Sequence, residues 1–457
     1  MTPARTLLVG FAVTNQAVAR GLRARGGEVL ATDDHPTDAV VAAAESAGVE
    51  LVVAPDERTL AELVRRCDAV VPSPLVPDGH AALAAAAAAG VPVLSEFDLA
   101  REWDDRPLVA ITGTDGKTTV TTMVTAMLEA SGHRALAVGN TEVPLVAAIE
   151  RADVEIFVVE ASSFRLGRTQ RFEPVVATWL NFAPDHLDVH ASVEAYEAAK
   201  ARIWAHLAPG GTAVANADDP VVMRNLRPGQ RTVTFGLGGG AHPPDYRLVG
   251  DSLVAPSGEV LVGRDELWRD LPHDVANALA ASATALAGGG TLEAVRSVLR
   301  TFAGLPHRVS FVAEHGGVRF YDDSKATTPH AAVAAALGFD SVVLLAGGRN
   351  KGLDLGALRQ ATDHLRAVVA IGEAAEEVAA TFAGVVPVRL VSTGMDDAVR
   401  AAAELARPGD VVLLSPGCAS FDWFGSYHER GEAFVQAVHR LLRHAGRDPG
   451  PGPEVAP

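Results

Sequence analysis

Residues 111–119 form a short glycine-containing loop that follows an apolar run and precedes a helical pattern. The loop reads Ile-Thr-Gly-Thr-Asp-Gly-Lys-Thr-Thr, and the apolar run in front of it predicts a buried strand. Gly113 and Gly116 let backbone N–H groups turn toward an anion, Lys117 adds a positive charge, and the Thr118 hydroxyl can bind a magnesium ion. Two residues separate these glycines, whereas four residues separate them in the common phosphate loop. The pattern predicts a strand–loop–helix unit that binds a nucleoside triphosphate; the alternative is an ordinary helix N-terminus.

Composition excludes several classes of protein. At 457 residues the chain is too long for one hydrophobic core, which predicts two or three domains. The formal net charge of -17 argues against nucleic-acid binding, because such a surface repels phosphates. Cys67 and Cys418 lie far apart in the sequence, which excludes a disulfide framework and fits a reducing compartment. No signal peptide or membrane-length apolar run is present in the sequence, so we expect a cytoplasmic protein without membrane insertion.

Strand-like runs alternate with alanine-rich helical runs, which predicts an α/β fold with mostly parallel sheets. The first segment ends at a polar joint near residues 103–107. Its expected strands are residues 6–9, 28–31, 51–53, 69–71 and 91–94.

The middle segment begins with the phosphate loop. Further strands are expected at residues 156–159 and 175–180, and they deliver Glu160 and Asn181 at their ends. The remaining predictions are a helical pattern through residues 196–206, a small antiparallel excursion within 231–265 and a helix at about 274–286.

The last segment begins after Gly304-Leu305-Pro306. Its expected strands are residues 309–313, 318–321, 342–346, 367–371, 388–391 and 411–415. The end of the chain is rich in proline and glycine, which predicts disorder. We therefore expect domains at residues 1–105, 106–304 and 305–446, followed by a disordered tail at 447–457.

Polar residues follow the middle strands. Glu160 can reach a magnesium ion held by Thr118, the alternatives being a helix cap or a surface acid. The loop 181–190 is dense in possible ligands and suits a second cation or a reacting carboxylate; the alternative is a polar loop with one hydrogen-bonded histidine. Helical periodicity alone makes Lys200 an ordinary surface lysine.

The last segment also carries polar groups at strand ends, where α/β sheets collect their active-site residues. Arg308 can bridge phosphate oxygens, and Asp323 can hold a ribose or a metal-bound water, unless it only pairs with the nearby Lys325. The loop 347–352 is a glycine turn with two cations, which suits an anionic substrate. Cys418 has no recognisable base nearby in sequence, which argues against covalent catalysis. In the first segment, Asp33 stands where an acid can meet a ribose or a base edge.

The order of these motifs resembles the Mur ligase family from residue 6 to about 442. The most specific matches are residues 113–119, 160–164, 181–186, 198–200, 277–280, 304–308, 323–327 and 415–422. The resemblance implies a Rossmann-like first domain that binds a uridine nucleotide, a central P-loop ATPase-like domain, and a Rossmann-like last domain that binds an amino acid. It also implies a monomeric ATP-dependent ligase of peptidoglycan synthesis that adds D-glutamate to UDP-N-acetylmuramoyl-L-alanine through an acyl phosphate and a tetrahedral intermediate.

The resemblance implies a role for particular residues. Two magnesium ions are implied, the first held by Thr118 and Glu160 and the second by His186 and a carbamylated Lys200. The implied ATP-binding residues are Gly113, Thr114, Asp115, Gly116, Lys117, Thr118, Thr119, Asn277, Arg308 and Asp323, and catalysis rests on Lys117, Glu160, His186 and Lys200. The implied substrate contacts are Thr14, Asp33, Ser73 and Asn140 for the UDP-sugar, and Thr327, Lys351, Ser420, Phe421 and Tyr427 for D-glutamate.

The sequence departs from the family pattern at three places. The loop after the first strand lacks the usual second glycine, Leu75 replaces a common glycine, and Asn350 stands where an aspartate is expected. Other interpretations are a sister Mur ligase, a folylpolyglutamate-synthase-like ligase, and a nucleotide-binding regulatory module without catalysis.

Overall fold

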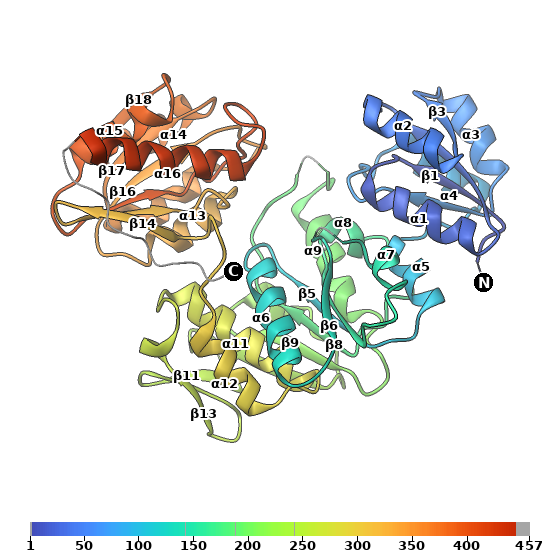
Figure 1. Cartoon of the computed structure of the whole chain (residues 1–457), viewed down its shortest axis with the longest axis horizontal. Helices are drawn as coiled ribbons and strands as arrows, with labels where there is room; N and C mark the ends of the chain where they lie inside the picture. The colour runs from blue at the N-terminus through green and yellow to red at the C-terminus, as the bar shows by residue number, and fades with distance from the viewer. Residues whose placement is uncertain (1, 142, 188, 242, 445–457) are drawn as a thin grey trace. The chain divides into compact units, whose positions relative to one another are not determined.

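The computed structural model describes residues 2–141, 143–187, 189–241 and 243–444 (Figure 1). The chain divides into two compact units. The first runs through Leu267 and includes Val275–Thr301; the second joins Trp268–Asp274 to the chain from Phe302 onward. The predicted tail at 447–457 lies outside the described residues, and the predicted domain boundaries near 105 and 304 stay predictions.

The first unit begins with a four-stranded parallel sheet in the order β3-β2-β1-β4. Its strands are β1 (Arg5–Val9), β2 (Glu28–Asp33), β3 (Glu50–Val53) and β4 (Ala69–Pro72), and its helices are α1 (Val13–Ala24), α2 (Asp38–Ala47), α3 (Glu57–Arg65), α4 (Ala81–Ala89) and α5 (Glu96–Trp103). Side chains cap the N-termini of α2, α3 and α5. The side-chain oxygens of Thr37, Asp56 and Ser95 accept hydrogen bonds from backbone N–H groups in the first turn of these helices. The predicted strand at 91–94 is wrong, because Val93 forms only an isolated bridge to Val70.

A second sheet in this unit has nine strands in the order β13-β12-β11-β10-β9-β8-β5-β7-β6. They are β5 (Leu108–Thr112), β6 (Ala135–Gly139), β7 (Ile156–Glu160), β8 (Val176–Trp179), β9 (Thr212–Asn216), β10 (Thr232–Gly236), β11 (Tyr246–Val249), β12 (Ser252–Val254) and β13 (Val260–Gly263). The predicted small antiparallel excursion within 231–265 is correct for β11 to β13 but wrong for β10, which pairs parallel with both β9 and β11 and extends the same sheet. Only β11, β12 and β13 pair antiparallel in this segment. The strands β6 and β9 were not predicted.

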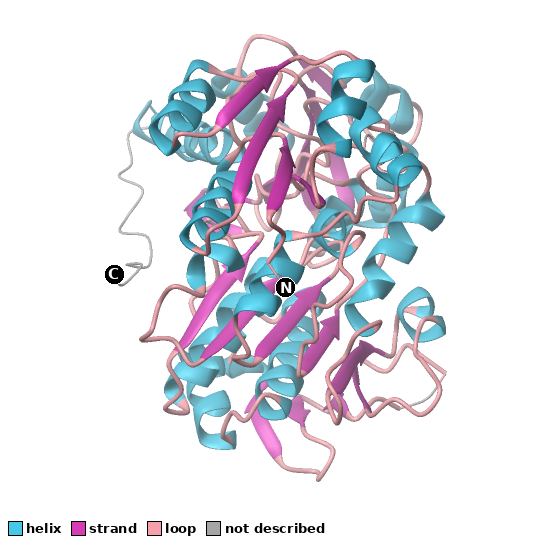
Figure 2. Cartoon of the chain, turned by 90° about the vertical axis from the view of Figure 1, so that its right-hand side faces the viewer, coloured by secondary structure: helices cyan, strands magenta, loops and turns pink. Residues whose placement is uncertain are grey.

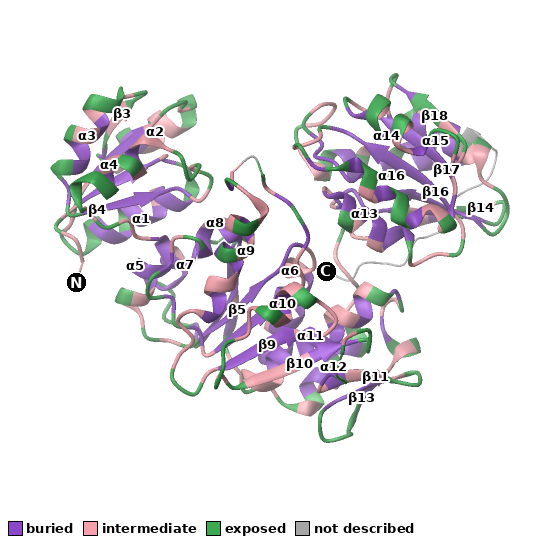
Figure 3. Ribbon diagram, turned by 180° about the vertical axis from the view of Figure 1, so that it is seen from behind, coloured by how far each residue is buried: buried purple, intermediate pink, exposed green. Residues whose placement is uncertain are grey.

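Helices of the second sheet include α6, which starts at the phosphate loop and packs against α12. The helices are α6 (Lys117–Ala130), α7 (Leu145–Ala148), α8 (Ser163–Leu166), α9 (Val193–Ala201), α10 (Pro220–Arg224), α11 (Pro272–Ala287) and α12 (Leu292–Thr301). One buried cluster runs through both sheets of the first unit, from Leu8 and Phe11 to Phe157 and Trp179 (Figure 3). Burial of this apolar surface holds the two sheets in one unit.

The second unit contains a six-stranded sheet in the order β14-β15-β19-β16-β17-β18. Figure 2 shows the helices and strands of the whole chain in separate colours. Its strands, all predicted, are β14 (Ser310–His315), β15 (Val318–Asp322), β16 (Val342–Gly347), β17 (Leu365–Ile371), β18 (Val388–Val391) and β19 (Val411–Leu414), and its helices are α13 (Pro329–Ala336), α14 (Ala375–Phe382), α15 (Met395–Leu405) and α16 (Tyr427–His444). Only the β14–β15 pair is antiparallel. Val342 and Leu344 face one core and Val343 and Leu345 the other, which explains why β16 is apolar throughout.

Candidate functional site

The predicted phosphate loop joins β5 to α6, and Asn181 holds its shape. The backbone N–H groups of Thr114 and Asp115 both donate to Asn181 Oδ1, at 3.0 and 2.9 Å. The Asn181 amide donates in return to the Asp115 carbonyl at 3.2 Å. Asn181 reaches the loop because β8, which it follows, lies beside β5. Sequence reasoning placed Asn181 at a strand end but missed this role.

Gly116 is the one position in this loop where the backbone requires glycine. Its φ is +81°, and a Cβ atom there would lie 2.5 Å from Asn277 Oδ1. Gly116 therefore combines a left-handed conformation with a close neighbour, and both exclude a larger residue. The contact also shows that α11 brings Asn277 beside the phosphate loop, as its predicted nucleotide-binding role requires.

Two lysine ammonium groups meet at one carbonyl oxygen under the loop. Lys117 Nζ donates to the Gly113 and Thr114 carbonyls at 2.9 and 2.8 Å, and Lys200 Nζ donates to the same Gly113 carbonyl at 2.6 Å. Lys200 on α9 is only 1% exposed, so the reading of it as a surface lysine is wrong. Burial, followed by the Lys117 charge, lowers the pKa of Lys200 well below its ordinary value.

Glu160 ends β7, the strand paired with β5 on the opposite side from β8. It is buried, so the surface-acid alternative is wrong. Its Oε1 accepts from the Asn140 amide at 3.0 Å, whereas its Oε2 is buried without a hydrogen-bond partner. A buried carboxylate oxygen without a donor is costly, and a bound cation would remove that cost. The residues present therefore fit a magnesium ion at this position.

The two histidines of the loop after Asn181 have different surroundings. His186 has a φ of +57°, and its Nε2 lies 3.2 Å from Asp185 Oδ2. His190 is buried, with its Nε2 2.9 Å from Ser163 Oγ. Asp188 lies outside the described residues. In the described ranges no three His, Cys, Asp or Glu side chains group as a metal site, and the predicted magnesium ligands Thr118, Glu160, His186 and Lys200 stay a prediction.

Only some of the residues predicted to contact the UDP-sugar lie close together. Asp33 Oδ2 accepts from the Phe11 N–H at 2.8 Å, and a Cβ atom on Gly10 would lie 3.0 Å from Ser73 Cβ, so both predicted residues adjoin the loop after β1. Thr14 Oγ1 instead accepts from Arg165 Nη2 at 3.2 Å. Asn140 belongs to the second sheet, where it binds Glu160.

Sequence reasoning missed two buried residues that hold this region. Asn15 donates from one amide to the Val9, Gly10 and Val71 carbonyls and so ties the loop to β4. Arg165 forms a buried ion pair with Glu96. Asn15 follows the loop after β1 and Arg165 follows the motif at residues 160–164, but the partners Val71 and Glu96 lie 56 and 69 residues away in the sequence.

In the second unit, Asp323 is buried at the end of β15. Its carboxylate accepts from Ser415 Oγ at 2.7 Å and from the Val309 N–H at 3.2 Å. Burial raises the pKa of Asp323 to about 7, although the Ser415 hydrogen bond and the Arg308 charge act in the opposite direction. The Arg308 guanidinium therefore lies near enough to act on the Asp323 carboxylate, and the ATP contacts of both residues stay a prediction.

The loops after β15, β16 and β19 lie together in the second unit and carry the predicted D-glutamate residues. Arg349 and Ala419 form a backbone bridge between the last two loops. Arg430, which sequence reasoning missed, is buried and donates to the Ser324 carbonyl at 2.8 Å and to the Cys418 carbonyl at 3.1 Å. Lys325 Nζ lies 3.8 Å from the centre of the Tyr427 ring. Burial raises the pKa of Cys418 to about 12, which agrees with an unreactive thiol.

The remaining predicted contacts of this group differ in exposure. Ser420 is buried, Phe421 is 60% exposed, and Thr327 and Lys351 are intermediate. Asn350, the departure from the family pattern, donates to the Leu353 carbonyl and to Glu377 and so braces its own loop.

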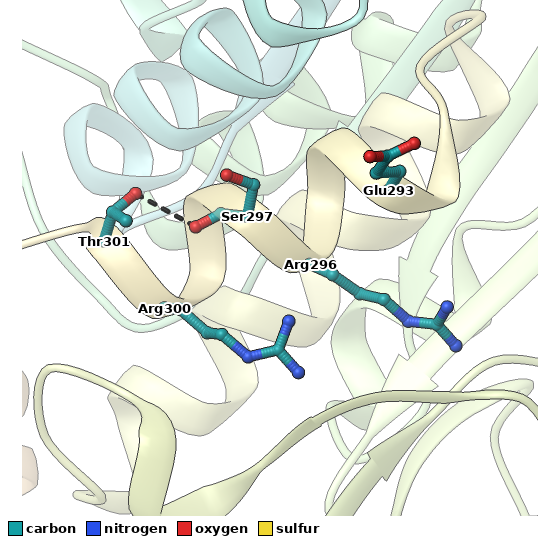
Figure 4. Close-up of a pocket in the computed structure, with 5 residues that line it drawn as sticks. All are labelled: Glu293, Arg296, Ser297, Arg300 and Thr301. Carbon is teal, nitrogen blue, oxygen red and sulfur yellow. Dashed lines mark hydrogen bonds between the residues drawn. The ribbon is translucent and has the colours of Figure 1, made fainter.

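A separate hollow runs along α12 (Figure 4). It is lined by Glu293, Arg296, Ser297, Arg300 and Thr301. Arg296 donates to the Val260 carbonyl and Arg300 to Glu266, so both guanidinium groups bind neighbouring structure. None of the predicted site residues lines this hollow.

Mostly parallel sheets and a lysine-bearing phosphate loop define a nucleotide-binding α/β protein. The Mur ligase middle domain matches residues 111–285, and the Mur ligase glutamate ligase domain matches residues 307–418. A UDP-N-acetylmuramoylalanine--D-glutamate ligase from Frankia casuarinae is 44% identical over 94% of this chain and 93% of its own. One from Geobacillus kaustophilus is 38% identical over 96% and 98%. The chain belongs to the Mur ligase family and, within it, to the family of UDP-N-acetylmuramoylalanine--D-glutamate ligases.

Solved structures agree on the fold. A pseudomurein peptide ligase type C from Methanothermus fervidus has a TM-score of 0.60 at 16% identity, over 96% of this chain and 100% of its own. MurF ligase from Thermotoga maritima in complex with ADP has a TM-score of 0.59 at 19% identity, over 96% and 95%. Among the described residues, no helix has the length and apolar character needed to cross a bilayer.

Proposed function

We propose that this protein is an ATP-dependent ligase that joins D-glutamate to UDP-N-acetylmuramoyl-L-alanine during cytoplasmic synthesis of a peptidoglycan precursor. Its near-full-length relatives carry the name of that reaction. The observation that carries the proposal is the meeting of Lys117 and buried Lys200 at the Gly113 carbonyl. A phosphate loop alone indicates nucleotide binding, whereas a buried amine beneath it indicates a site prepared for chemistry.

The residues of the first unit divide the binding work. The backbone of residues 113–119 and Lys117 would hold the triphosphate, and Asn277 would contact the adenine. Thr118 and Glu160 would hold one magnesium ion, and His186 with Lys200 would hold a second. ATP supplies the phosphoryl group that converts the acceptor carboxylate into an acyl phosphate, and magnesium neutralises the crowded oxygens.

Lys200 changes its charge in this proposal. Its neutral amine attacks carbon dioxide: an N–C bond forms as one C–O π bond opens, and one proton leaves to solvent, so the neutral amine becomes a carbamate anion. Burial favours the change, because it stabilises the neutral amine over the ammonium form. The Gly113 carbonyl can keep accepting the carbamate N–H, which leaves the two new oxygens for a cation.

The other predicted residues bind the two organic substrates. Thr14, Asp33, Ser73 and Asn140 would contact the UDP-sugar. Thr327, Lys351, Ser420, Phe421 and Tyr427 would contact D-glutamate, whose carboxylates suit the Lys351 ammonium. In the second unit Arg308 would contact phosphates and Asp323 the ATP ribose. We also propose that the working form is a monomer, which analytical ultracentrifugation tests.

Phosphate release tests the proposed function. The protein is incubated with ATP, magnesium, UDP-N-acetylmuramoyl-L-alanine and one of D-glutamate, L-glutamate, L-alanine or D-aspartate. We expect release only with D-glutamate. Release with UDP-N-acetylmuramate and L-alanine would indicate a sister ligase, release with a pterin and L-glutamate a folylpolyglutamate-synthase-like ligase, and no release under any condition a regulatory module.

A further inference from the structure

His190 lies where three segments of the first unit meet. Its ring stacks on Phe164 at 5.5 Å between centroids and packs against Tyr196 at 5.3 Å. Its Nε2 is 2.9 Å from Ser163 Oγ, and its Nδ1 is 3.5 Å from Asp78 Oδ2. A histidine held on two faces and at both nitrogens can move only if its partners move with it.

Asp78 belongs to the loop that follows β4 and begins at Ser73, one of the residues proposed to contact the UDP-sugar. Arg168 also holds this loop, donating to Asp78 Oδ1 at 3.0 Å and to the Val76 carbonyl at 2.6 Å. Half of the Asp78 side chain remains exposed. Through Asp78, the loop at residues 73–78 therefore contacts both His190 and Arg168, which follows α8.

The other end of this arrangement reaches the phosphate loop. The Tyr196 hydroxyl lies 3.3 Å from Thr114 Oγ1, and Thr114 Oγ1 donates to the Ala183 carbonyl at 3.0 Å. Lys200 Nζ lies 4.6 Å from the centre of the Tyr196 ring. Packed groups thus connect Asp78, through His190 and Tyr196, to the loop that would bind ATP.

We propose that His190 is a positioning residue that couples UDP-sugar binding at residues 73–78 to nucleotide binding at the phosphate loop. The inference rests on the proposed function. Its physical basis is a short turn that His190 shares with His186, a proposed magnesium ligand. The backbone N–H of His190 donates to the backbone carbonyl of His186 at 3.0 Å. Ordering Asp78 with bound UDP-sugar would order His190, and with it the turn and Tyr196.

The protonation of His190 suits this link. Asp78 is an acceptor, so Nδ1 carries the proton and Nε2 accepts from the Ser163 hydroxyl. Burial lowers the pKa of His190, Asp78 raises it, and Lys200 and Arg168 lower it. The two contacts therefore hold the ring in one orientation, with Nδ1 toward Asp78 and Nε2 toward Ser163.

Calorimetry on the full chain tests the link. The affinity for magnesium ADP is measured with and without saturating UDP-N-acetylmuramoyl-L-alanine, in wild type, His190→Phe, Asp78→Asn and the double variant. His190→Phe keeps an aromatic ring between Phe164 and Tyr196 and removes both nitrogens. Wild type should show coupling of about fivefold or more. Each single variant should reduce the coupling to near one, and the double variant should lose no more than either single variant.

A matched control is Glu150→Gln. Arg25, which follows α1, forms an ion pair with Glu150 at 3.0 Å. This exposed ion pair also joins the chain around the first sheet to the chain around the second, but it touches neither residues 73–78 nor the phosphate loop. Its coupling should equal that of wild type. A merely structural role for His190 would lower the melting temperature and leave the coupling unchanged.

Retained coupling in Asp78→Asn or His190→Phe, or none in wild type, would overturn the inference. If His190→Phe does not fold, Asp78→Asn decides, because Asp78 is half exposed. Failure of the UDP-sugar to bind wild type at all would instead overturn the proposed function, and this inference with it.

Discussion

Lys200 shows how burial determines the chemistry of a single residue. On a solvated helix face its amine would be charged, but below the phosphate loop Lys200 is buried and the Lys117 ammonium lies beside it. Both conditions favour the neutral amine. Glu160 is the complementary case, a buried carboxylate with one oxygen left without a donor. Burial thus favours the form of Lys200 that the proposed carbamylation requires, and it leaves Glu160 with an oxygen that the proposed magnesium ion would bind.

We expect Lys200→Ala to lower turnover by more than about 100-fold, because a charged ligand near the developing charge is lost. Added formate or acetate should restore part of the activity by replacing the carbamate. Lys200→Arg keeps a cation that cannot be carbamylated, and short carboxylates should not rescue it. Phosphate release measured across carboxylate concentrations checks both, and an unrescued alanine variant would contradict the carbamate role.

Asp323 should make stability depend on pH. Its pKa in the fold, about 7, lies above the ordinary 3.8, so its contribution is full below 3.8 and is lost as pH rises through 7. Wild type should therefore lose stability relative to Asp323→Asn over that range, by up to about 4 kcal/mol. Urea unfolding at several pH values measures it.

Asp410 in the same unit provides the control with opposite sign. Burial raises the pKa of Asp410, but hydrogen bonds from Arg366, Ser341 and the Arg407 backbone outweigh it and lower the pKa overall. Stability relative to Asp410→Asn should therefore fall as the solution becomes acidic. A wild-type stability that does not vary relative to Asp323→Asn would contradict the assignment of a raised pKa.

At the scale of elements, the phosphate loop depends on neighbours from other strands and helices. Asn181 after β8 orients its N–H groups, and Asn277 of α11 fills the space beside Gly116. The helix α6 begins at once after Gly116, which puts the loop at a helix N-terminus. Loop and helix form the anion site together only while these neighbours hold their positions.

Gly116→Ala should therefore reduce ADP affinity by more than about tenfold, since its Cβ atom displaces Asn277 and its φ becomes strained. Gly132→Ala is the matched control, because Gly132 has a φ of +91° and nothing within 4 Å of its Cβ position. Both should cost about 1–2 kcal/mol of stability, but only Gly116→Ala should weaken ADP binding. Calorimetry with magnesium ADP distinguishes them, and equal losses of affinity would show that strain alone is responsible.

At the scale of the whole molecule, the residues proposed for separate binding tasks lie beside separate sheets. Asp33 and Ser73 adjoin one loop of the four-stranded sheet, and Lys117 and Lys200 lie on helices beside the nine-stranded sheet. Asp323 belongs to the second unit. Strand ends of parallel sheets place polar loops at one edge, and three such edges suit a reaction with three substrates.

Lys117→Ala should abolish phosphate release and leave the affinity for UDP-N-acetylmuramoyl-L-alanine within about threefold, below the range of strong coupling between sites. Asp33→Asn should do the reverse, weakening UDP-sugar binding while ADP still binds. Paired calorimetric titrations check this, and equal loss of both ligands in either variant would contradict the division between the sheets.

The local sequence determined the elements whose signals are short-range. The apolar run before the phosphate loop, the glycines within it and the six strands of the second unit follow from backbone preference, and β16, β17 and β19 also follow from burial on two faces. A window of a few residues records both signals. The local sequence did not reveal β6 and β9, and it wrongly predicted a strand at residues 91–94. Short apolar runs such as these are equally compatible with strand, helix and turn.

Only the tertiary structure decided which polar residues are buried and which partners they meet. Lys200 binds a carbonyl 87 residues away, and His190 meets Asp78 from another sheet. Arg430 contacts Ser324 over 106 residues. Desolvation and hydrogen bonding depend on every atom nearby in space, whereas periodicity along the chain records only which face of an element avoids water.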